Sequence, residues 1–211
     1  MSKPELWLIA GPNGAGKSTI VGKHRHLLSK LVPEVTFINP DEHARRLLIA
    51  QGYRGFADAP LPVQKSAFIE AATALEEETG RRLSAGIATG IETVLSTTKY
   101  QRFVKSVTEA RGMFGLIYVA LNSPEIACRR VAHRVAQGGH DVPADKIRER
   151  WIRSLDNLPW FIRHATHAYV FDNSSDADVP PVPIARKHHG ILEASFDLAF
   201  PALRAALETA A

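Results

Sequence analysis

The sequence contains a single cysteine, Cys128, and no apolar run that approaches the length of a membrane span. One thiol cannot close a disulfide within the chain, which is typical of proteins from a reducing compartment. A transmembrane helix needs about 20 mostly apolar residues. The first apolar run, at residues 6–10, is far shorter and lacks the pattern of a signal peptide. We therefore expect a cytoplasmic protein with no membrane partner.

Internal repeats and low-complexity segments are also missing. A chain of 211 residues with 45% hydrophobic and 23% charged residues can bury a sizeable core, and we expect residues 1–211 to form a single domain. The formal net charge of +4 permits a partner that is either nucleic acid or a small anionic molecule. The positive charge is concentrated between Arg129 and Arg153, and no lysine-rich tail is present. Nucleic acid is therefore the less favoured partner.

Residues 11–18 have the pattern Gly-x-x-x-x-Gly-Lys-Ser of a phosphate-binding loop, or P-loop. An apolar run at residues 5–10 predicts a buried strand before the loop, and residues 19–30 have helical spacing after it. The glycines let backbone N–H groups surround an anion, and the helix dipole adds to the attraction. Lys17 is expected to bind the β- and γ-phosphates and the Ser18 hydroxyl to bind magnesium. The predicted nucleotide-binding residues are Gly11, Pro12, Asn13, Gly14, Ala15, Gly16, Lys17, Ser18 and Thr19.

An aspartate follows the second predicted strand, at residues 35–38. Pro40 ends this strand because proline lacks the N–H that a strand ladder needs. Asp41 then lies at the carboxyl end of the strand, where ligands bind in open α/β sheets. It also lies at the start of a predicted helix at residues 42–51, so a helix cap is the alternative interpretation.

Residues 42–85 are predicted to form a helical insertion between the second and third strands, where small P-loop kinases have their acceptor-binding subdomain. The third strand is predicted at residues 87–94, and Glu92 and Thr93 lie at its carboxyl end. Glu92 would give the site a second carboxylate beside Asp41. The alternative interpretation is a polar residue in a loop.

Two helices that carry arginines follow the fourth predicted strand, at residues 114–121. Ser123 and Pro124 are typical of a helix start, as N-cap and first helical residue. A glycine-containing turn joins this helix to one predicted at residues 144–164, so residues 124–165 have the organisation of a closing lid. A solvated charged hairpin is the alternative. The arginines of the two helices include Arg130, Arg134, Arg148, Arg150 and Arg153.

The remaining residues predict a last parallel strand at 167–171, followed by Asp172 and Asn173. Beyond a proline-containing loop, we expect one short strand at 184–192 and a closing helix at 195–207. Strands that alternate with helices in this way predict an α/β fold with a mostly parallel sheet.

Several P-loop classes are excluded by motifs that are absent. No asparagine is followed by lysine and no aspartate has glycine three residues later, so the base reader and switch of GTPases are missing. The Ser-Gly-Gly signature of ABC-type ATPases is also missing. A small kinase remains, because phosphoryl transfer needs chiefly charge neutralisation and a carboxylate that orients the acceptor hydroxyl. Lys17, magnesium and lid arginines would supply the first, and Asp41 the second.

The motifs together resemble the zeta-toxin family of P-loop kinases over about residues 5–175. The matching segments are Gly11-Pro-Asn-Gly-Ala-Gly-Lys-Ser-Thr19, Ile38-Asn-Pro-Asp41, Glu92-Thr-Val-Leu-Ser96, Leu121-Asn-Ser-Pro-Glu125, Arg130-Val, Arg134-Val, Gly138-Gly-His-Asp-Val-Pro143 and Asp172-Asn-Ser174. The resemblance implies a three-layer α/β/α P-loop fold with a mostly parallel central sheet, a small helical acceptor-binding insertion and a helical lid.

The resemblance also implies ATP- and Mg²⁺-dependent phosphorylation of a hydroxyl, in zeta toxins that of UDP-N-acetylglucosamine. Lys17 would hold phosphates, Asp41 would act as the base, and Glu92, Thr93 and Arg148 would bind the acceptor. Arg134, together with Arg148 or Arg150, would stabilise the transferring group. Arg130, Asp172 and Asn173 would bind the nucleotide.

The acceptor is left open by two departures from the family. The insertion is small, and residues 87–91 lack an aromatic residue expected before Glu92. One chain also gives no sign of an antitoxin partner. A small anionic acceptor such as a nucleotide sugar is favoured. The alternatives are a nucleic-acid or nucleoside hydroxyl kinase, and a non-catalytic module whose lid is ordered by ATP.

Overall fold

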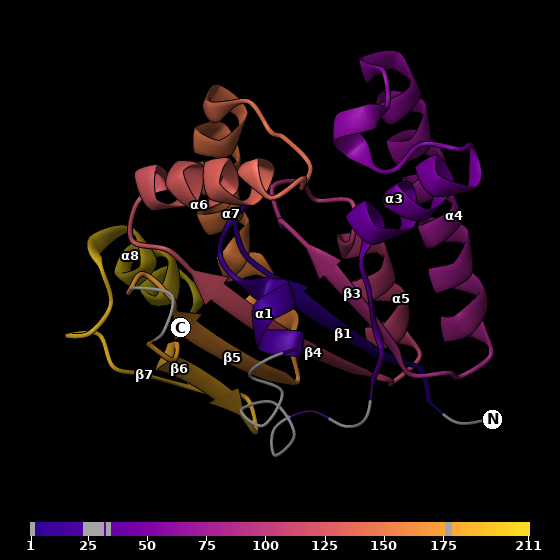
Figure 1. Ribbon diagram of the computed structural model, residues 1–211. Helices are drawn as coiled ribbons and strands as arrows, with labels where there is room; N and C mark the ends of the chain where they lie inside the picture. Colours follow the sequence, from indigo (N-terminus) through magenta and orange to yellow (C-terminus); the bar gives the residue numbers. More distant parts are fainter. Residues whose placement is uncertain (1–2, 23–31, 33–34, 176–178) are drawn as a thin grey trace.

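The computed structural model describes residues 3–22, 32, 35–175 and 179–211. Its centre is a seven-stranded sheet with the order β2-β3-β1-β4-β5-β6-β7 (Figure 1). The first five of these strands in space are parallel, and β6 and β7 are antiparallel additions to one edge. The strands are β1 (Glu5–Ala10), β2 (Phe37–Ile38), β3 (Thr89–Thr93), β4 (Met113–Ala120), β5 (His167–Asp172), β6 (Val182–His188) and β7 (Ile191–Ala194).

β1 and β4 lie at the centre because both are nearly continuous apolar segments, the sequence expected of strands covered on both faces. Five consecutive residues of β1, from Leu6 to Ala10, are buried. Since β1 lies between β3 and β4, the loop that leaves its carboxyl end emerges in the middle of the sheet edge. Ligands bind at such a place in open α/β folds.

Helices cover both faces of the sheet. One buried cluster joins the sheet to residues of α4, α5, α7 and α8, and a second joins the opposite face to α1 and α6. This arrangement confirms the predicted three-layer α/β/α fold with a mostly parallel sheet. The helices are α1 (Lys17–Gly22), α3 (Pro40–Ala50), the short 3-10 helix η1 (Phe56–Asp58), α4 (Leu61–Ser84), α5 (Gln101–Glu109), α6 (Pro124–Ala136), α7 (Ala144–His164) and α8 (Pro201–Ala210).

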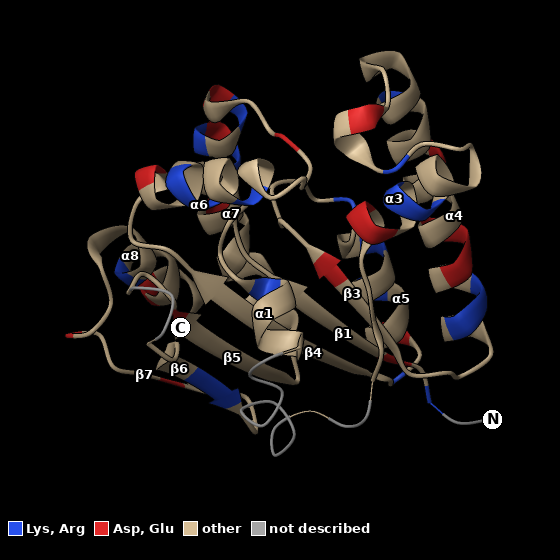
Figure 2. Cartoon of the chain, viewed as in Figure 1, with Lys and Arg blue, Asp and Glu red and all other residues tan. Residues whose placement is uncertain are grey.

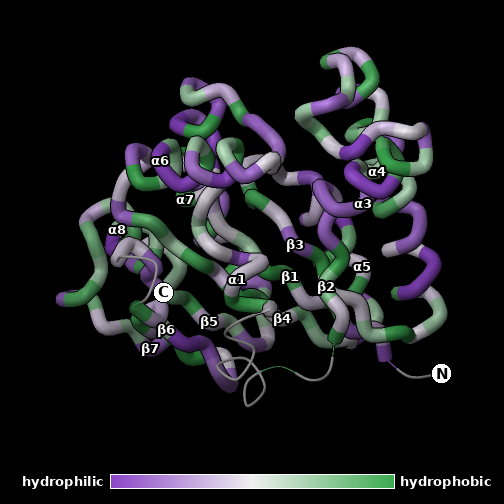
Figure 3. The backbone as a smooth tube through the Cα atoms, in the orientation of Figure 1, coloured by the Kyte–Doolittle hydropathy of each residue, from purple (hydrophilic) through white to green (hydrophobic). Residues whose placement is uncertain are grey.

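Two helical units rise from the carboxyl edge of the parallel strands on either side of α1 (Figure 1). The insertion comprises α3, η1 and α4, and it has a small apolar core of its own around Leu48, Phe56 and Ala71. The lid comprises α6, the loop at residues 137–143 and α7. Hydrophobic colouring follows the strands, whereas the lid has long hydrophilic stretches (Figure 3). Within the described part of the chain, none of the helices is long and apolar enough to cross a bilayer.

The C-terminal region differs from the prediction in two ways. Residues 184–192 were expected to form one strand, but β6 and β7 form a hairpin there. His189 and Gly190 have φ values of 50° and 79°, which is the backbone of a tight two-residue hairpin turn. The closing helix begins at Pro201 rather than at residue 195, since proline is favoured at the first helical position. The predicted helix at residues 19–30 is described only to Gly22, and the rest lies outside the described residues.

Gly115 and Gly80 lie in different surroundings, so replacing each of them with alanine is predicted to have opposite effects on stability. A Cβ at Gly115 would lie 2.3 Å from the Trp7 ring, whereas a Cβ at Gly80, inside α4, would meet no atom within 4 Å. We expect Gly115→Ala to lower the free energy of unfolding by about 1–3 kcal/mol through overpacking. Gly80→Ala should raise it by about 0.5–1 kcal/mol through helix propensity. Urea denaturation measures both, and a Gly115→Ala protein as stable as the wild type would contradict this description of the core.

Candidate active site

The P-loop at residues 11–16 joins β1 to α1, and its glycines are required by its geometry. Gly11, Gly14 and Gly16 have φ values of 142°, 72° and 89°, a region that side chains disfavour. The loop is also pressed against the sheet: a Cβ at Gly11 would lie 2.1 Å from the carbonyl oxygen of Val119 in β4. The sequence pattern therefore corresponds to a closed backbone cradle at the first turn of α1.

Lys17 is the first residue of α1, and its side chain is folded under the loop. The residue is only 7% exposed, and its Nζ donates hydrogen bonds to the carbonyl oxygens of Gly11 at 2.8 Å and Pro12 at 3.0 Å. Burial lowers the pKa of Lys17, while the nearby carboxylates of Glu92 and Asp41 act in the opposite direction. A buried ammonium beside two carboxylates is an environment that an incoming phosphate can complete.

Glu92 connects the P-loop to the segment after β2. Its two carboxylate oxygens each accept from the Ser18 hydroxyl at 3.0 Å, and Oε2 also accepts from Asn39 Nδ2 at 2.9 Å. Glu92 was predicted to bind the acceptor, but its carboxylate lies against the predicted magnesium ligand. Hydroxyl and carboxylate oxygens are ligands that Mg²⁺ accepts, directly or through its waters. This donor set fits a magnesium ion bound at Ser18.

Asp41 lies near the start of α3 but does not cap it. The cap is Asn39, whose Oδ1 accepts from the backbone N–H of Asp41 at 2.8 Å and of Glu42 at 3.4 Å. The Asp41 carboxylate instead lines the cleft beside the P-loop. Within the described residues it forms no hydrogen bond or ion pair, so it is available to a ligand hydroxyl.

The lid contributes three arginines to the cleft, Arg134 from α6 and Arg150 and Arg153 from α7. Arg134 donates from Nη2 to the carbonyl oxygen of His140 at 2.8 Å. Arg150 forms no ion pair among the described residues. Arg148 does not line the cleft: its Nε lies 3.5 Å from a Glu125 carboxylate oxygen, in a pair that links the two lid helices. The predicted acceptor-binding role of Arg148 is therefore not supported by its position.

The segment after β5 lies beside the P-loop, as its predicted nucleotide-binding residues require. Asn173 Nδ2 donates to the carbonyl oxygen of Ala15 at 2.8 Å. Arg130 donates to the carbonyl oxygen of Gly14 at 3.4 Å and to that of Ser175 at 2.5 Å. Asp172 does not contact the loop directly but holds the turn, where its Oδ1 accepts from the Ser174 N–H at 2.9 Å.

One cleft of about 540 Å³ is lined by Lys17, Asp41, Glu92, Arg134 and Arg150, whereas its lining does not include Ser18, Arg130, Asp172 or Asn173. Charged segments of the lid and insertion face each other across it, above a positively charged start of α1 and a negatively charged end of β3 (Figure 2). Sequence reasoning missed several lining residues. Most of them follow Thr93 in the chain or lie within one helical turn of Arg150, and those two rules would have found them, whereas neither rule points to Asn39. The added residues include Asn39, Ser96, Thr97, Lys99, Tyr100, Lys146, Glu149 and Arg153.

The cleft fits the triphosphate and magnesium that the motifs predict. Two polar side-chain atoms on its wall, Asn13 Oδ1 and Arg134 Nε, are buried without a hydrogen-bond partner among the described residues. Such atoms are uncommon in folded proteins and are frequently satisfied by ligands. Arg134 Nε, the glycine cradle and the buried Lys17 provide donors for phosphate oxygens, whereas Asn13 Oδ1 is an acceptor for a ligand hydroxyl or a water.

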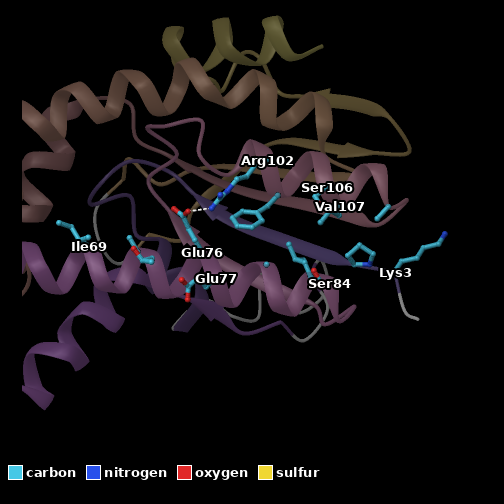
Figure 4. A pocket seen from close by; sticks show the side chains of 15 residues that line it. Lys3, Ile69, Glu76, Glu77, Ser84, Arg102, Ser106 and Val107 are labelled. Atoms are coloured by element: carbon cyan, nitrogen blue, oxygen red, sulfur yellow. Dashed lines mark hydrogen bonds and ion pairs between the residues drawn. The ribbon is translucent and has the colours of Figure 1, made fainter.

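A larger groove of about 1080 Å³ lies elsewhere, between α4 and α5. Its side chains are mostly aliphatic or paired with each other, as with Arg102 and Glu76 (Figure 4). It contains none of the P-loop or lid residues described above. The P-loop and the lid arginines therefore lie at the smaller cleft.

No protein-family model matches the chain, and no curated protein matches it significantly. Solved structures do match. The complex of AvrRxo1-ORF1 and ORF2 with ATP gives a TM-score of 0.70 at 15% sequence identity, over 92% of this chain and 61% of that chain. The PezAT chromosomal toxin–antitoxin system of Streptococcus pneumoniae gives 0.59 at 18% identity, over 82% of this chain and 69% of that chain.

A third match is the Pnkp1/Rnl/Hen1 RNA repair complex, with a TM-score of 0.52 at 19% identity over 74% of this chain and 46% of that chain. This chain thus spans 61% of the first matched chain and less of the third. At these identities the likeness concerns the fold. The three-layer α/β/α fold with a mostly parallel sheet, predicted from the motifs, is shared with these structures.

The geometry of the P-loop predicts a loss of ATP binding on a minimal substitution. Gly16→Ala would place a methyl group 2.5 Å from Asn173 Nδ2 at a backbone φ of 89°. Gly22→Ala, at the end of the same helix, meets no atom within 4 Å and is the matched control. We expect the first change to weaken ATP binding by at least about tenfold and the second to leave it unchanged, as measured by calorimetry. Equal affinities would mean that this loop does not hold the nucleotide.

Proposed function

We propose that the chain is an ATP- and Mg²⁺-dependent kinase that transfers a phosphoryl group to a hydroxyl of a small anionic acceptor. One observation carries the proposal. The Asp41 carboxylate, which forms no hydrogen bond or ion pair among the described residues, shares a cleft with the P-loop Lys17 and with the lid arginines Arg134 and Arg150. A carboxylate near the phosphate site and cations around it are the parts that phosphoryl transfer requires.

The P-loop side of the cleft would hold the nucleotide. Lys17 and the loop N–H groups bind phosphate oxygens, and Ser18, with Glu92 behind it, orients the magnesium ion. Asn173 and Arg130 donate hydrogen bonds to carbonyl oxygens of the loop, and we infer that the nucleoside would bind beside them. When bound, Mg-ATP supplies the phosphoryl group and a leaving group whose charge the metal neutralises.

The residues around Asp41 would act on the acceptor. The Asp41 carboxylate would orient the acceptor hydroxyl and take its proton, a role worth roughly 10²–10⁴-fold in rate. Arg134 and Arg150 would bind the oxygens of the transferring phosphoryl group, on which charge accumulates. Arg150 is suited to this because it has no ion pair among the described residues.

The composition of the acceptor side supports an anionic substrate. Lys146, Arg150 and Arg153 share one face of α7, and Lys99 lies on the segment after β3. Only one acidic residue of α7, Glu149, lines the cleft with them, and it pairs with Lys146 and Arg153 at 3.0 and 2.7 Å. A volume of about 540 Å³ is typical of a small-molecule site. A nucleotide sugar such as UDP-N-acetylglucosamine, whose diphosphate would meet these cations, is the acceptor that we favour.

Location and partners are proposals of the same kind. A single thiol agrees with a cytoplasmic protein. Two of the structural neighbours belong to a two-protein complex and to a toxin–antitoxin system. We therefore propose that a second protein also binds this chain. A pull-down with the protein encoded by the adjacent gene would test this proposal.

The experiment that tests the function is ADP formation with Mg-ATP in the presence of single acceptors. The panel comprises nucleotide sugars, free sugars, nucleosides and oligonucleotides. Stimulation by nucleotide sugars supports the proposal, and stimulation by oligonucleotides alone would contradict it in favour of a nucleic-acid kinase. ATP binding without stimulation by any acceptor would support a non-catalytic module.

Asp41→Asn tests the assignment of the base. The amide keeps the shape of the side chain but cannot accept the hydroxyl proton, so we expect the transfer rate to fall by at least about 10²-fold. ATP affinity should stay within about twofold, since the P-loop is untouched. Initial rates and calorimetry measure the two quantities. A variant that transfers phosphate at the wild-type rate would show that another group is the base.

Arg150→Ala and Arg148→Ala form a matched pair on one helix. Arg150 lines the cleft, whereas Arg148 pairs with Glu125 outside it. We expect loss of Arg150 to lower kcat by at least about 10²-fold, because an arginine on the transferring group is worth roughly 10³–10⁵. Loss of Arg148 should change kcat less than about threefold, as for an exposed ion pair. The opposite order in steady-state kinetics would refute this placement of the lid.

A further inference from the structure

The loop between the two lid helices is shaped so that it reaches the insertion. Gly138 has a φ of 83°, which turns the chain at the end of α6. Gly139 is packed against Arg134: a Cβ there would lie 2.6 Å from Arg134 Cγ and 2.9 Å from its carbonyl oxygen. The next residue, His140, is thereby directed away from the lid. Two glycines in succession are thus needed for the position of this one histidine.

His140 contacts two aromatic rings of the insertion. Phe56 of η1 and Phe68 of α4 are stacked with centroids 5.3 Å apart. The His140 ring lies across both, with its centroid 5.0 Å from that of Phe56 and 4.3 Å from that of Phe68. Among the described residues, these two contacts of the His140 ring are the aromatic contacts that join the lid to the insertion. They bridge the two sides of the cleft.

The same residue holds Arg134. The carbonyl oxygen of His140 accepts from Arg134 Nη2 at 2.8 Å, and the Gly139 N–H donates back to the Arg134 carbonyl oxygen at 3.0 Å. Arg134 is close enough to Lys17 to act on its pKa, which it lowers. The segment at residues 139–140 therefore contacts the insertion through the His140 ring, and it contacts Arg134 through its backbone groups.

We propose that His140 is a positioning residue: its ring seats the lid on the Phe56–Phe68 pair, and its carbonyl group thereby holds Arg134 over the P-loop. Closure of the lid would then be coupled to the acceptor-binding insertion. The consequence for catalysis rests on the proposed kinase function. The seating of the lid does not rest on that function, because it concerns only the distance between the lid and the insertion.

The neutral imidazole is the form that fits this seat. Burial lowers the pKa of His140 below its ordinary value of 6.5. The charges that face the ring come from α3, α6, its own loop and α7: Asp41 and Asp141 act to raise the pKa, and Arg134 and Arg150 act to lower it. Because the seated state has the lower pKa, seating releases protons. Seating of the lid is therefore complete at pH values above the ordinary histidine pKa, and it is lost as the pH falls through the lower pKa of His140 in the seated state.

Spin labels can measure the seating without turnover. We would place labels at Ala50 of α3 and Ala136 of α6, both exposed, in a Cys128→Ser background. Electron–electron double resonance would be recorded at about pH 8 and about pH 5, on either side of the ordinary histidine pKa. At the higher pH we expect His140→Ala to give longer and broader distances than the wild type. His140→Phe, which keeps a ring, should give the wild-type distances.

The lower pH separates titration of His140 from general effects of acid. The wild-type distances should lengthen there, whereas those of His140→Phe should stay the same, because phenylalanine does not titrate. His133→Ala, an exposed histidine on the same lid helix, is the control and should behave as the wild type does. If His140→Ala retains the wild-type distances, or if His140→Phe opens with acid as the wild type does, the seating is refuted.

Action through Arg134 is tested by ATP affinity in a double-mutant cycle. His140→Ala should weaken ATP binding by about tenfold, equivalent to about 1.4 kcal/mol, and His140→Phe by less than about twofold. In an Arg134→Ala background, His140→Ala should have no further effect, since the group that it positions is gone. Additive losses would show that His140 acts independently of Arg134. Absence of kinase activity would refute the proposed function and leave both of these measurements interpretable.

Discussion

The structure depends on a close approach of backbones at the end of β1. A side chain at Gly11 cannot be accommodated, because its Cβ would lie 2.1 Å from the carbonyl oxygen of Val119. The approach brings the P-loop to the middle of the sheet edge, with β3 on one side and β4 on the other. The loop carbonyls can then hold the buried Lys17 ammonium, on which the charges of Glu92, Asp41 and Arg134 act.

The parallel order of five strands explains how segments far apart in the chain meet there. Each segment of the cleft leaves the carboxyl end of a strand, and parallel strands end at one edge. Cross-links then fix the segments to each other. Glu92 joins the P-loop to the segment after β2, Asn173 joins the loop to the segment after β5, and His140 joins the lid to the insertion. The proposed chemistry requires all three cross-links, since it depends on reacting groups that are held within hydrogen-bonding distance of one another.

Local signals in the sequence were enough for the parallel strands, the P-loop and the lid helices, but not for the C-terminal hairpin. The predicted bounds of β1 and α7 agree with the structure because an apolar run and a proline start define them. Contacts across the fold were not predictable in this way. Glu92 was assigned to the acceptor through the family resemblance. Its contact with Ser18 depends on the pairing of β1 with β3, which spacing in the sequence does not encode. Arg148 and Arg150 are two residues apart, and only the packing of α7 on α6 decides which of them faces the cleft. Which residue contacts Phe68 likewise depends on tertiary packing.

The most direct test of the account is ³¹P NMR of the protein with Mg-ATP and the acceptor that stimulates ADP formation. Transfer to a hydroxyl converts each ATP into one ADP and one new phosphomonoester. We predict that the phosphomonoester signal grows in step with the ADP signals and that both are lost with Asp41→Asn. ADP accompanied only by inorganic phosphate would show that water is the acceptor, and it would contradict the claim that this cleft is a kinase active site.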